Sequence, residues 1–511
     1  MGALDKIGDA IDNAIAVFSP QAYQRRLQYR TAALHQKRYY EGATKGRRGE
    51  SWRKVDNAER EPYAQLLSLR NRSRDFSRNN GYAKKAVGGI VANTVGTGIV
   101  LQYKSDASRK RADKMNEAWK LWHDTTECDF NGLLTGNALQ ELCFRTMVES
   151  GEVFIRRRVV ETTKKSTKIP LKLQVIEPEY LNESLDSGIS ATGSRIIKGI
   201  EYNSDDVRTF YHFYKNHPGD TASQESVKVP ADQVIHLFRK TRPDQQRGVP
   251  WGHAAMLNLK DLDDYEDSEL VRRKVASAFC GFVSRSEVEM GAPINGMNPN
   301  DLGLPPLVDR VEPGIIEHLG PGESISFTTP PNVTGYGEYV QQVLHKIASG
   351  YEVPYSVLTG DYSLVNFSSG RMGWLEFQRV IEQWRWNLFI PTFLDVVKGW
   401  FESIASLKGL NFSGLTYEWT APRREMIDPL KEITAKTMQV KAGLVSMQEA
   451  IKEMGYDPEG NISEIKAWNA LLDANGIILD SDPRKDPKRL IAENVALGIK
   501  MKDNLDKDSE D

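Results

Sequence analysis

Cysteine is scarce in this sequence: only three occur among 511 residues, at Cys128, Cys143 and Cys280. No two of them form a Cys-x-x-Cys pair, which argues against a zinc ribbon and a disulfide scaffold. Because disulfide-rich chains are typical of oxidising compartments, we expect this chain to work in a reducing cytoplasm. The N-terminus has neither a basic segment nor a long apolar core, so no signal peptide is predicted.

Long hydrophobic runs are also missing. No apolar stretch approaches the roughly 18 to 20 residues that a membrane helix needs. The best candidate, residues 388–397, is short and contains Pro391 and Asp395. We therefore expect no membrane segment.

Motifs for nucleotide or hydrolytic chemistry are absent too. The sequence has no phosphate loop of the Gly-x-x-x-x-Gly-Lys-Ser/Thr type, no His-Glu-x-x-His motif and no Gly-x-Ser-x-Gly turn. Residues 96–98 read Gly-Thr-Gly, but a dinucleotide motif needs a third glycine and a preceding strand. We expect no enzymatic activity and no cofactor.

Three histidines, His212, His217 and His236, fall in a region rich in strand-forming residues. Two histidines on adjacent strands could bind a metal ion, but no carboxylate or cysteine has a ligand-like spacing to them. We expect structural roles for these side chains and no metal site.

The composition is that of a large globular protein, with 40% hydrophobic and 27% charged residues. At about 150 residues per domain, the length predicts about three domains. The net charge of −2 hides an uneven distribution: residues 24–85 carry 17 Lys/Arg against 6 Asp/Glu, whereas residues 260–269 carry six acids and one base. Such zones are either solvated faces or surfaces that meet partner subunits or nucleic acid.

Hydrophobic periodicity predicts a mixed α+β fold. Residues 1–20 have an apolar stripe typical of a short helix, which would dock on the body of the protein or on a partner, and residues 62–94 return to helical spacing. Runs of β-branched and aromatic residues predict strands at 153–160, 171–176, 207–214 and 234–238.

Residues 251–283 are predicted to form one long helix with an acidic block followed by a basic block. Glu269 and Arg273 can pair within it at i, i+4. A helix with this order of charges is suited to lying beside a staggered copy of itself. The candidate subunit-interface residues are Asp263, Asp264, Asp267, Glu269, Arg272, Arg273 and Lys274.

Residues 284–334 hold 8 of the 23 prolines and 6 glycines, and they are predicted to form a compact insert. Within it, residues 314–329 read as a hairpin that turns at Pro321-Gly322. A returning helix is predicted at 337–350, then a loop at 351–370. A long helix is predicted at 371–407, with a kink at Pro391.

The C-terminal part is predicted to be helical, with clear start and stop signals. Asp428-Pro429 starts a helix that Gly443 closes, and Ser446 begins a capping box. Further helices are predicted from Ser463 to residue 476 and from Asp486-Pro487 onward.

A series of short motifs carries a resemblance over roughly residues 60–460. Earlier ones are Arg78-Asn79-Asn80, Gly151-Glu152, Ile176-Glu177-Pro178 and Arg247-Gly248-Val249-Pro250-Trp251. The most specific are Val353-Pro354-Tyr355, residues 358–363 (Leu-Thr-Gly-Asp-Tyr-Ser) and residues 366–371 (Asn-Phe-Ser-Ser-Gly-Arg). In these motifs and their order the chain resembles the lambda-type bacteriophage portal proteins. Gly81 departs from the family, which usually has proline there.

The resemblance implies a homo-oligomeric ring of twelve subunits at one vertex of a virus capsid. Double-stranded DNA would pass through the ring during packaging and ejection, without dependence on its sequence. The implied partners are the terminase large subunit, the major capsid protein, the scaffold and later a head–tail connector. The chain would thus be a virion protein that assembles in the host cytoplasm.

The resemblance also implies an α+β portal fold with named regions. Residues 1–60 would be an N-terminal amphipathic helix and basic arm, 61–250 the wing, 251–283 a stem helix and 284–334 the clip. Residues 335–350 would be the returning stem helix, 351–370 the tunnel loop, 371–424 a long kinked wing helix and 425–511 a helical crown.

The loop at 351–370 supplies the candidate residues for contact with DNA. In a ring, one lumen-facing arginine is repeated in every subunit, and strong phosphate binding would stall a sliding duplex. The lumen should therefore be polar and only weakly attractive. The DNA-channel candidates are Tyr362, Ser363, Asn366, Ser368, Ser369 and Arg371, although Arg371 fits this requirement less well and would hold the root of the loop or pair with a neighbour. A competing interpretation is that Ser368 or Ser369 is only the N-cap of a helix that starts near Arg371.

Two other functional classes compete with a structural ring. A DNA-processing enzyme of the packaging machinery is disfavoured because ATPase and nuclease motifs are missing. An adaptor without a channel would be distinguished from a ring by imaging.

Overall fold

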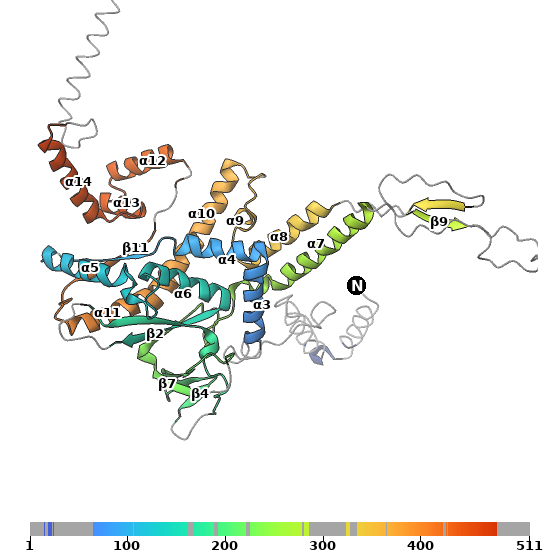
Figure 1. Cartoon of the computed structure of the whole chain (residues 1–511), viewed down its shortest axis with the longest axis horizontal. Helices are drawn as coiled ribbons and strands as arrows, with labels where there is room; N and C mark the ends of the chain where they lie inside the picture. Colours follow the sequence, from blue (N-terminus) through green and yellow to red (C-terminus); the bar gives the residue numbers. More distant parts are fainter. Residues whose placement is uncertain are drawn as a thin grey trace, which may run out of the picture. The chain divides into compact units, whose positions relative to one another are not determined.

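The computed structural model describes residues 15, 19–22, 24, 65–105, 107–160, 168–188, 193–220, 225–277, 281–285, 323–327, 335–363, 365–422, 426 and 428–477. The chain divides into two compact units, one of residues 1–64 with 242–244 and one of residues 65–241 with 245–511. All features below belong to the second unit (Figure 1). Most of the helix predicted at 1–20, the helix predicted from Asp486-Pro487 onward and almost all of the predicted insert lie outside the described residues.

Helical structure in 62–94 is confirmed, but it consists of two helices, α3 (Leu66–Asn79) and α4 (Gly81–Thr94). Asn80 separates them because its backbone is extended and its side-chain oxygen accepts a hydrogen bond from the Ala83 N–H (3.0 Å). This is an N-cap, so the chain turns at Asn80 and starts a new helix. One face of α4 is buried in the core.

Strands within residues 100–238 and 416–420 form three antiparallel sheets, and two strands between residues 281 and 327 form a fourth. The first pairs β1 (Val100–Lys104) with β11 (Thr416–Thr420). The second has the order β3-β2-β8 and contains β2 (Glu152–Val159), β3 (Leu171–Ile176) and β8 (Val234–Phe238). The third has the order β4-β5-β6-β7, from β4 (Arg195–Ile197), β5 (Ile200–Tyr202), β6 (Arg208–Tyr214) and β7 (Ser226–Pro230). All four predicted strands are confirmed to within a residue at either end.

Strand β2 lies at the centre of the second sheet and contacts a different partner on each face. Val153 and Ile155 belong to the main hydrophobic core. Phe154 points the other way, and its ring packs against those of Tyr211 and Phe213 in the third sheet. This alternation is the period of two expected for a strand buried on both faces.

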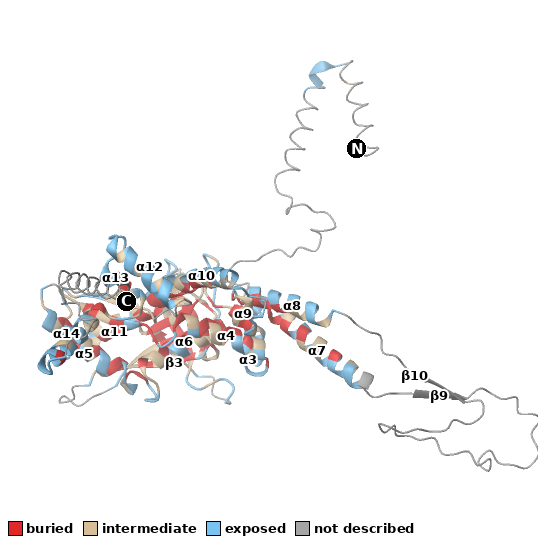
Figure 2. Cartoon of the chain, turned by 90° about the horizontal axis from the view of Figure 1, so that it is seen from above, coloured by how far each residue is buried: buried red, intermediate tan, exposed pale blue. Residues whose placement is uncertain are grey.

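The main core lies between the second sheet and several helices. These are α5 (Arg109–His123), α6 (Gly136–Ser150), α10 (Phe367–Trp384) and α11 (Asp395–Ser406), with the π-helical segment η7 (Arg385–Leu394) between the last two. The connections between these elements contain four short 3-10 helices: η2 (Thr126–Cys128), η3 (Pro178–Tyr180), η4 (Ala231–Gln233) and η5 (Trp251–Ala254). Figure 2 shows the buried residues concentrated around α4, α6 and β3.

The long helix predicted at 371–407 exists but is longer and less regular than expected. It begins at Phe367 and runs through α10, η7 and α11 to Ser406. Pro391 lies inside the π-helical segment. Proline cannot donate to the α-helical ladder, and a π segment is one way in which a helix accommodates such a disruption.

The single helix predicted at 251–283 is wrong at both ends. Trp251–Ala254 is the 3-10 turn η5, the helix α7 covers Met256–Ser277, and Gly281–Arg285 is the strand β9. β9 pairs antiparallel with β10 (Glu323–Phe327). The alternating Gly-Phe-Val-Ser-Arg pattern therefore follows its strand period instead of continuing the helix. β10 is the second half of the hairpin predicted at 314–329, and the first half lies outside the described residues.

The returning helix is confirmed as α8 (Tyr336–Gly350). It lies beside α7, as Figures 1 and 2 both show. The ring of Tyr265 on α7 packs against Tyr336 and Tyr339 on α8, with centroids 5.8 and 4.7 Å apart.

The C-terminal helices are α12 (Pro429–Lys441), α13 (Met447–Glu453) and α14 (Pro458–Ala474). The predicted starts at Asp428-Pro429 and Ser446 are confirmed, since Asp428 accepts from Lys431 N and Ser446 from Glu449 N. The predicted start at Ser463 is wrong. Asp457 caps α14 by accepting from the N–H groups of residues 459 and 460, so an Asp-Pro pair starts this helix as well.

Together these elements confirm a mixed α+β fold. None of the described helices combines the length and the apolar character that crossing a bilayer requires.

Candidate functional site

The predicted loop at 351–370 contains one short helix and the start of a second. α9 (Tyr355–Thr359) follows α8 closely, and Gly360 ends it with a positive φ of 75°. α10 begins at Phe367. Only residues 360–366 therefore connect the helices, and an Asx turn organises the start of this link because Asp361 accepts from Ser363 N (2.9 Å). Hydrogen bonds from the Ser363 hydroxyl and from its backbone N–H lower the pKa of Asp361.

The N-cap of α10 is Asn366, so the interpretation that Ser368 or Ser369 caps a helix near Arg371 is wrong. Asn366 Oδ1 accepts from Ser369 N (2.8 Å), and Ser369 Oγ accepts from Asn366 N (3.2 Å). This is a capping box, with Ser369 at the N3 position. The box uses Oδ1 of Asn366 and leaves its Nδ2 group as a donor.

Four of the six DNA-channel candidates line one groove. Its volume is about 670 Å³, and Tyr362, Asn366, Ser369 and Arg371 lie along it. Ser363 and Ser368 are not among the residues that line it. The remaining walls are largely apolar and aromatic: His345 of α8, Tyr355 and Val357 of α9, Trp374 of α10, and Val365 of the link contribute to them. The groove is thus an aromatic surface with a polar rim and one cation.

The subunit-interface candidates on α7 satisfy much of their charge within the chain. Glu269 accepts from Arg272 (2.6 Å) and from Arg273 (2.9 Å), which confirms the predicted i, i+4 pair. These hydrogen bonds lower the pKa of Glu269 to about 2. Asp264 pairs with Lys260 (2.7 Å), and Asp263 accepts from Asn80 (2.8 Å).

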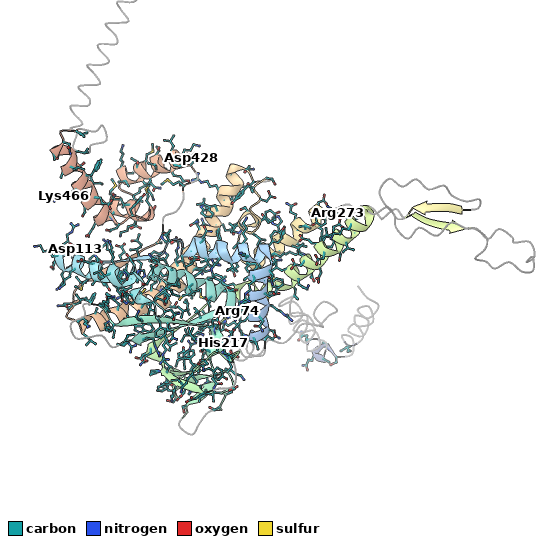
Figure 3. All side chains as sticks on the ribbon, in the orientation of Figure 1. Arg74, Asp113, His217, Arg273, Asp428 and Lys466 are labelled. Atoms are coloured by element: carbon teal, nitrogen blue, oxygen red, sulfur yellow. The ribbon has the colours of Figure 1, made fainter. Side chains whose placement is uncertain are left out.

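Other α7 side chains remain available for contacts between subunits. Asp267 makes no ion pair with any residue that the structure describes, whereas Lys274 has an interaction partner within the chain. Arg273, labelled in Figure 3, also lies over the ring of Tyr336. Leu270 and Val271 are 50% and 58% exposed. The predicted staggered packing would therefore rest on apolar contacts as well as on charge.

A buried cluster of charges around strand β2 was missed by reasoning from the sequence. Glu152 is fully buried and accepts from Arg70 (2.6 Å) and from Arg247 (2.5 Å), two arginines that are also buried. Gly248 N and His236 Nε2 complete its contacts, each at 2.9 Å. Burial alone would raise the pKa of Glu152, but the two guanidinium groups and His236 hold it well below its usual range.

Two glycines allow the backbone to close around this cluster. Gly151 has a φ of 91°, and a Cβ there would lie 2.5 Å from the backbone of Val249. A Cβ on Gly248 would lie 2.0 Å from the carbonyl oxygen of Gly151. Both glycines belong to motifs singled out in the sequence, and that was the only signal that could have pointed to the cluster.

The three histidines all contact carboxylates, which the sequence spacing did not reveal. His236 donates Nε2–H to Glu152, and its Nδ1 accepts from Arg208 (3.3 Å), so the neutral imidazole carries its proton on Nε2. Burial lowers the pKa of His236 to about 4, although Glu152 opposes this. His212 lies 3.4 Å from Glu201.

His217 belongs to a cluster with Glu177 and Glu179, whose possible ligand atoms lie within 4.8 Å of one another. Arg74, labelled with His217 in Figure 3, pairs with Glu179 at 2.9 Å and with Glu177 at 3.8 Å. Because this guanidinium already supplies the counter-charge, we assign no metal ion to the cluster.

Comparison with known proteins identifies the family. A family model described as phage portal protein, lambda family, matches residues 45–385. A probable portal protein of Halomonas phage phiHAP-1 is 25% identical over 452 residues, covering 84% of this chain and 85% of that protein. Portal protein B of Escherichia phage lambda is 20% identical over 435 residues, covering 76% and 80%.

The portal protein of Escherichia phage N15 is 22% identical over 438 residues, covering 76% of this chain and 81% of that protein. Among solved structures, chains from the neck of an empty GTA particle and from the virion of a native gene transfer agent particle align with TM-scores of 0.42 and 0.43. Their identities are 14% and 13%, and each alignment covers 77% of this chain and 94% of the other. Because the family match alone spans more than half of the sequence, this chain belongs to the lambda family of phage portal proteins.

Proposed function

We propose that copies of this chain assemble into a closed ring that forms the DNA channel at one vertex of the capsid. Double-stranded DNA passes through this channel during packaging and again during ejection. The observation that carries the proposal is the family match over residues 45–385. As a portal protein, the chain is a structural component of the virion and not an enzyme.

The regions of the portal are proposed to follow the elements of the chain. The three sheets with their covering helices belong to the wing (61–250 and 371–424), and α7 and α8 are the stem helices. The insert at 284–334 is the clip, the 351–370 segment is the tunnel loop, and α12 to α14 belong to the crown at 425–511. The close packing of α7 against α8 supports the stem, since the two helices that flank the insert run side by side.

Ring assembly is proposed to bury one face of α7. Leu257, Leu270 and Val271 on this helix are each at least half exposed in the isolated chain. Several large apolar side chains exposed on one helix indicate a surface that another molecule covers. A neighbouring subunit with its own α7 would cover them, and Asp267 would add a charged contact.

Contact with DNA is proposed to be weak and independent of base sequence. The rim of the tunnel-loop groove offers hydroxyl and amide groups, which can donate to phosphate oxygens without reading bases. Arg371 is a single cation beside acidic and aromatic neighbours in this segment. Weak phosphate binding lets the duplex slide, because affinity grows with the number of phosphates neutralised.

The clip is proposed to dock the terminase large subunit during packaging and the head–tail connector afterwards. The major capsid protein and the scaffold are proposed to contact the ring from outside. Support for these partners comes from family membership and from the position of the insert between two packed helices, since loops on rigid scaffolds commonly carry binding.

Electron microscopy of the purified full-length chain tests the ring directly. We expect closed rings with a central channel, and we expect light scattering to report a mass many times that of one chain at micromolar concentration. A strictly monomeric species under these conditions would contradict the proposal. ATPase and nuclease assays on the same sample should show no activity above that of a buffer control.

A further inference from the structure

A cavity of about 630 Å³ lies between the second and third sheets of the wing region. Residues of both sheets line it, including Arg156 and Arg158 of β2, Gln174 of β3 and Tyr214 of β6. Its volume is within the range typical of small-molecule sites. The channel function uses none of these residues.

The two arginines reach this cavity because of the alternation along β2. Phe154 contacts the third sheet through Tyr211 and Phe213, and Arg156 and Arg158 continue the same face. Arg157 projects from the opposite face, where it pairs with Asp232 (3.0 Å) and lies over the ring of Trp400. Adjacent arginines of one strand are thus in different environments: one is paired and two are not.

Neither Arg156 nor Arg158 has a carboxylate at ion-pair distance among the residues that the structure describes. Nε of Arg156 is buried and makes no hydrogen bond. Arg158 contacts the ring of Phe130 at 5.2 Å. Burial lowers the pKa of Arg156, and the neighbouring Arg158 lowers it further. Both side chains are partly buried, and two neighbouring cations without a counter-charge among the described residues repel each other, so this pair of guanidinium groups is suited to binding an anion.

Nearby acidic groups are already used elsewhere. Glu177 lines the cavity but pairs with Arg74 and His217. Asp129 accepts from the backbone N–H groups of residues 131, 133 and 134. No described acid therefore supplies the counter-charge, and an anionic ligand can supply it.

We propose that this cavity binds a phosphate-bearing small molecule, with Arg156 and Arg158 holding the phosphate. Two guanidinium forks present more donors than one carboxylate can accept, whereas a tetrahedral phosphate has enough oxygens for both. Gln174 adds an amide donor. Tyr180, Phe213 and Tyr214 form an aromatic wall against which an organic or nucleoside part can lie.

Thermal unfolding and calorimetric titration of the purified full-length protein test this proposal, with inorganic phosphate and AMP as probes. Chloride at matched ionic strength is the reference, because it removes general screening by salt. We expect a saturable rise in Tm with phosphate and a larger one with AMP. The variants Arg156→Gln and Arg158→Gln should each bind at least about tenfold more weakly, since each removes a charged donor.

Arg157→Gln is the matched control, because it removes the same charge one residue away on the opposite face. It should keep the full response to phosphate. Without ligand, Arg156→Gln should be at least as stable as the wild type, because it removes one of two neighbouring cations that repel each other.

Two results would overturn the proposal. The first is a wild-type protein whose Tm responds to phosphate and AMP no more than to chloride. The second is a saturable response that persists in the double variant Arg156→Gln, Arg158→Gln. A lower Tm of Arg156→Gln without ligand, together with no response of the wild type, would assign this arginine to packing alone.

Discussion

Replacing Glu152 with Gln should destabilise the protein severely, because Glu152 neutralises two buried arginines. Arg70 is 1% exposed, and Arg247 and Glu152 are fully buried. Glutamine preserves the shape but loses the charge, and its amide group would face a guanidinium donor. Removing one partner of a buried ion pair typically costs about 3–5 kcal/mol, so we expect a loss of this size in the free energy of unfolding.

Urea unfolding followed by tryptophan fluorescence measures this loss, with all variants at one protein concentration because assembly stabilises the folded state. Glu225→Gln is the control, since Glu225 pairs with Lys215 at 2.8 Å but is 65% exposed. An exposed pair of this kind contributes about 0–1 kcal/mol. A difference of less than about 1 kcal/mol between the two variants would refute the reasoning.

A triple variant separates uncompensated charge from lost packing. Changing Arg70→Met, Glu152→Leu and Arg247→Met together removes all three charges and keeps similar volumes. Apolar replacement of buried charges together is often neutral or stabilising. Glu183 also pairs with both arginines, but it is one third exposed and can be solvated once they are removed. We expect the triple variant to recover most of the stability that Glu152→Gln loses. If it is as unstable as the single variant, the cost arises from shape and not from charge.

Four further predictions follow from the structure. His236 has a pKa of about 4 in the folded protein, below its ordinary value near 6.5, so its contribution to stability is complete above pH 6.5 and is lost as the pH falls toward 4. Denaturation at a series of pH values should therefore show the free energy of unfolding fall by about 3 kcal/mol over this range in the wild type, and much less in His236→Gln. A wild-type free energy of unfolding that does not change with pH would contradict this prediction. Charge reversal across residues 272–274 should weaken ring assembly in light scattering, more so at low salt, and unchanged assembly would exclude these residues from the interface. Replacing residues 284–334 by a short linker should leave rings intact and abolish DNA packaging; normal packaging would place the docking surface elsewhere. Asn366→Ala should lose a helix cap worth about 1 kcal/mol, whereas Asn366→Asp keeps the acceptor of the cap but loses the Nδ2 donor. Faulty DNA packaging or retention by Asn366→Asp at normal stability would support a channel role. Normal packaging and retention by this variant would count against that role.

Much of the second and third sheets could be predicted from sequence, because their strands carry strong local signals. The run Leu171–Ile176 is bounded by Pro170 and Glu177-Pro178, and β3 has these bounds in the structure. The starts of α12 and α13 could be predicted equally well from their N-cap residues, Asp428 before Pro429 and Ser446. Such features depend on a few neighbouring residues, so the sequence alone indicates them.

The predicted ends of helices were wrong where a local sequence signal competed with tertiary packing. The helix predicted through residue 283 ends at Ser277, and β9 takes over because Gly281–Arg285 has a strand partner in β10. β10 is about 40 residues away in the sequence, so no local pattern around residues 281–285 could predict this pairing. The cap of α10 was placed two or three residues too late, since Asn366, Ser368 and Ser369 are all good caps and only the backbone selects Asn366.

The sequence by itself determined the family, the α+β class and most helices and strands, because these depend on residue order, periodicity and short motifs. Only the tertiary structure decided which charges are satisfied. Glu152 meets Arg70 and Arg247 across separations of 82 and 95 residues, whereas Arg156 and Arg158 meet no acid among the described residues. Charged residues appear the same in a sequence whether their side chains are paired, solvated or buried without a partner. Their energies differ because burial and distance, which the fold sets, determine the strength of every electrostatic interaction.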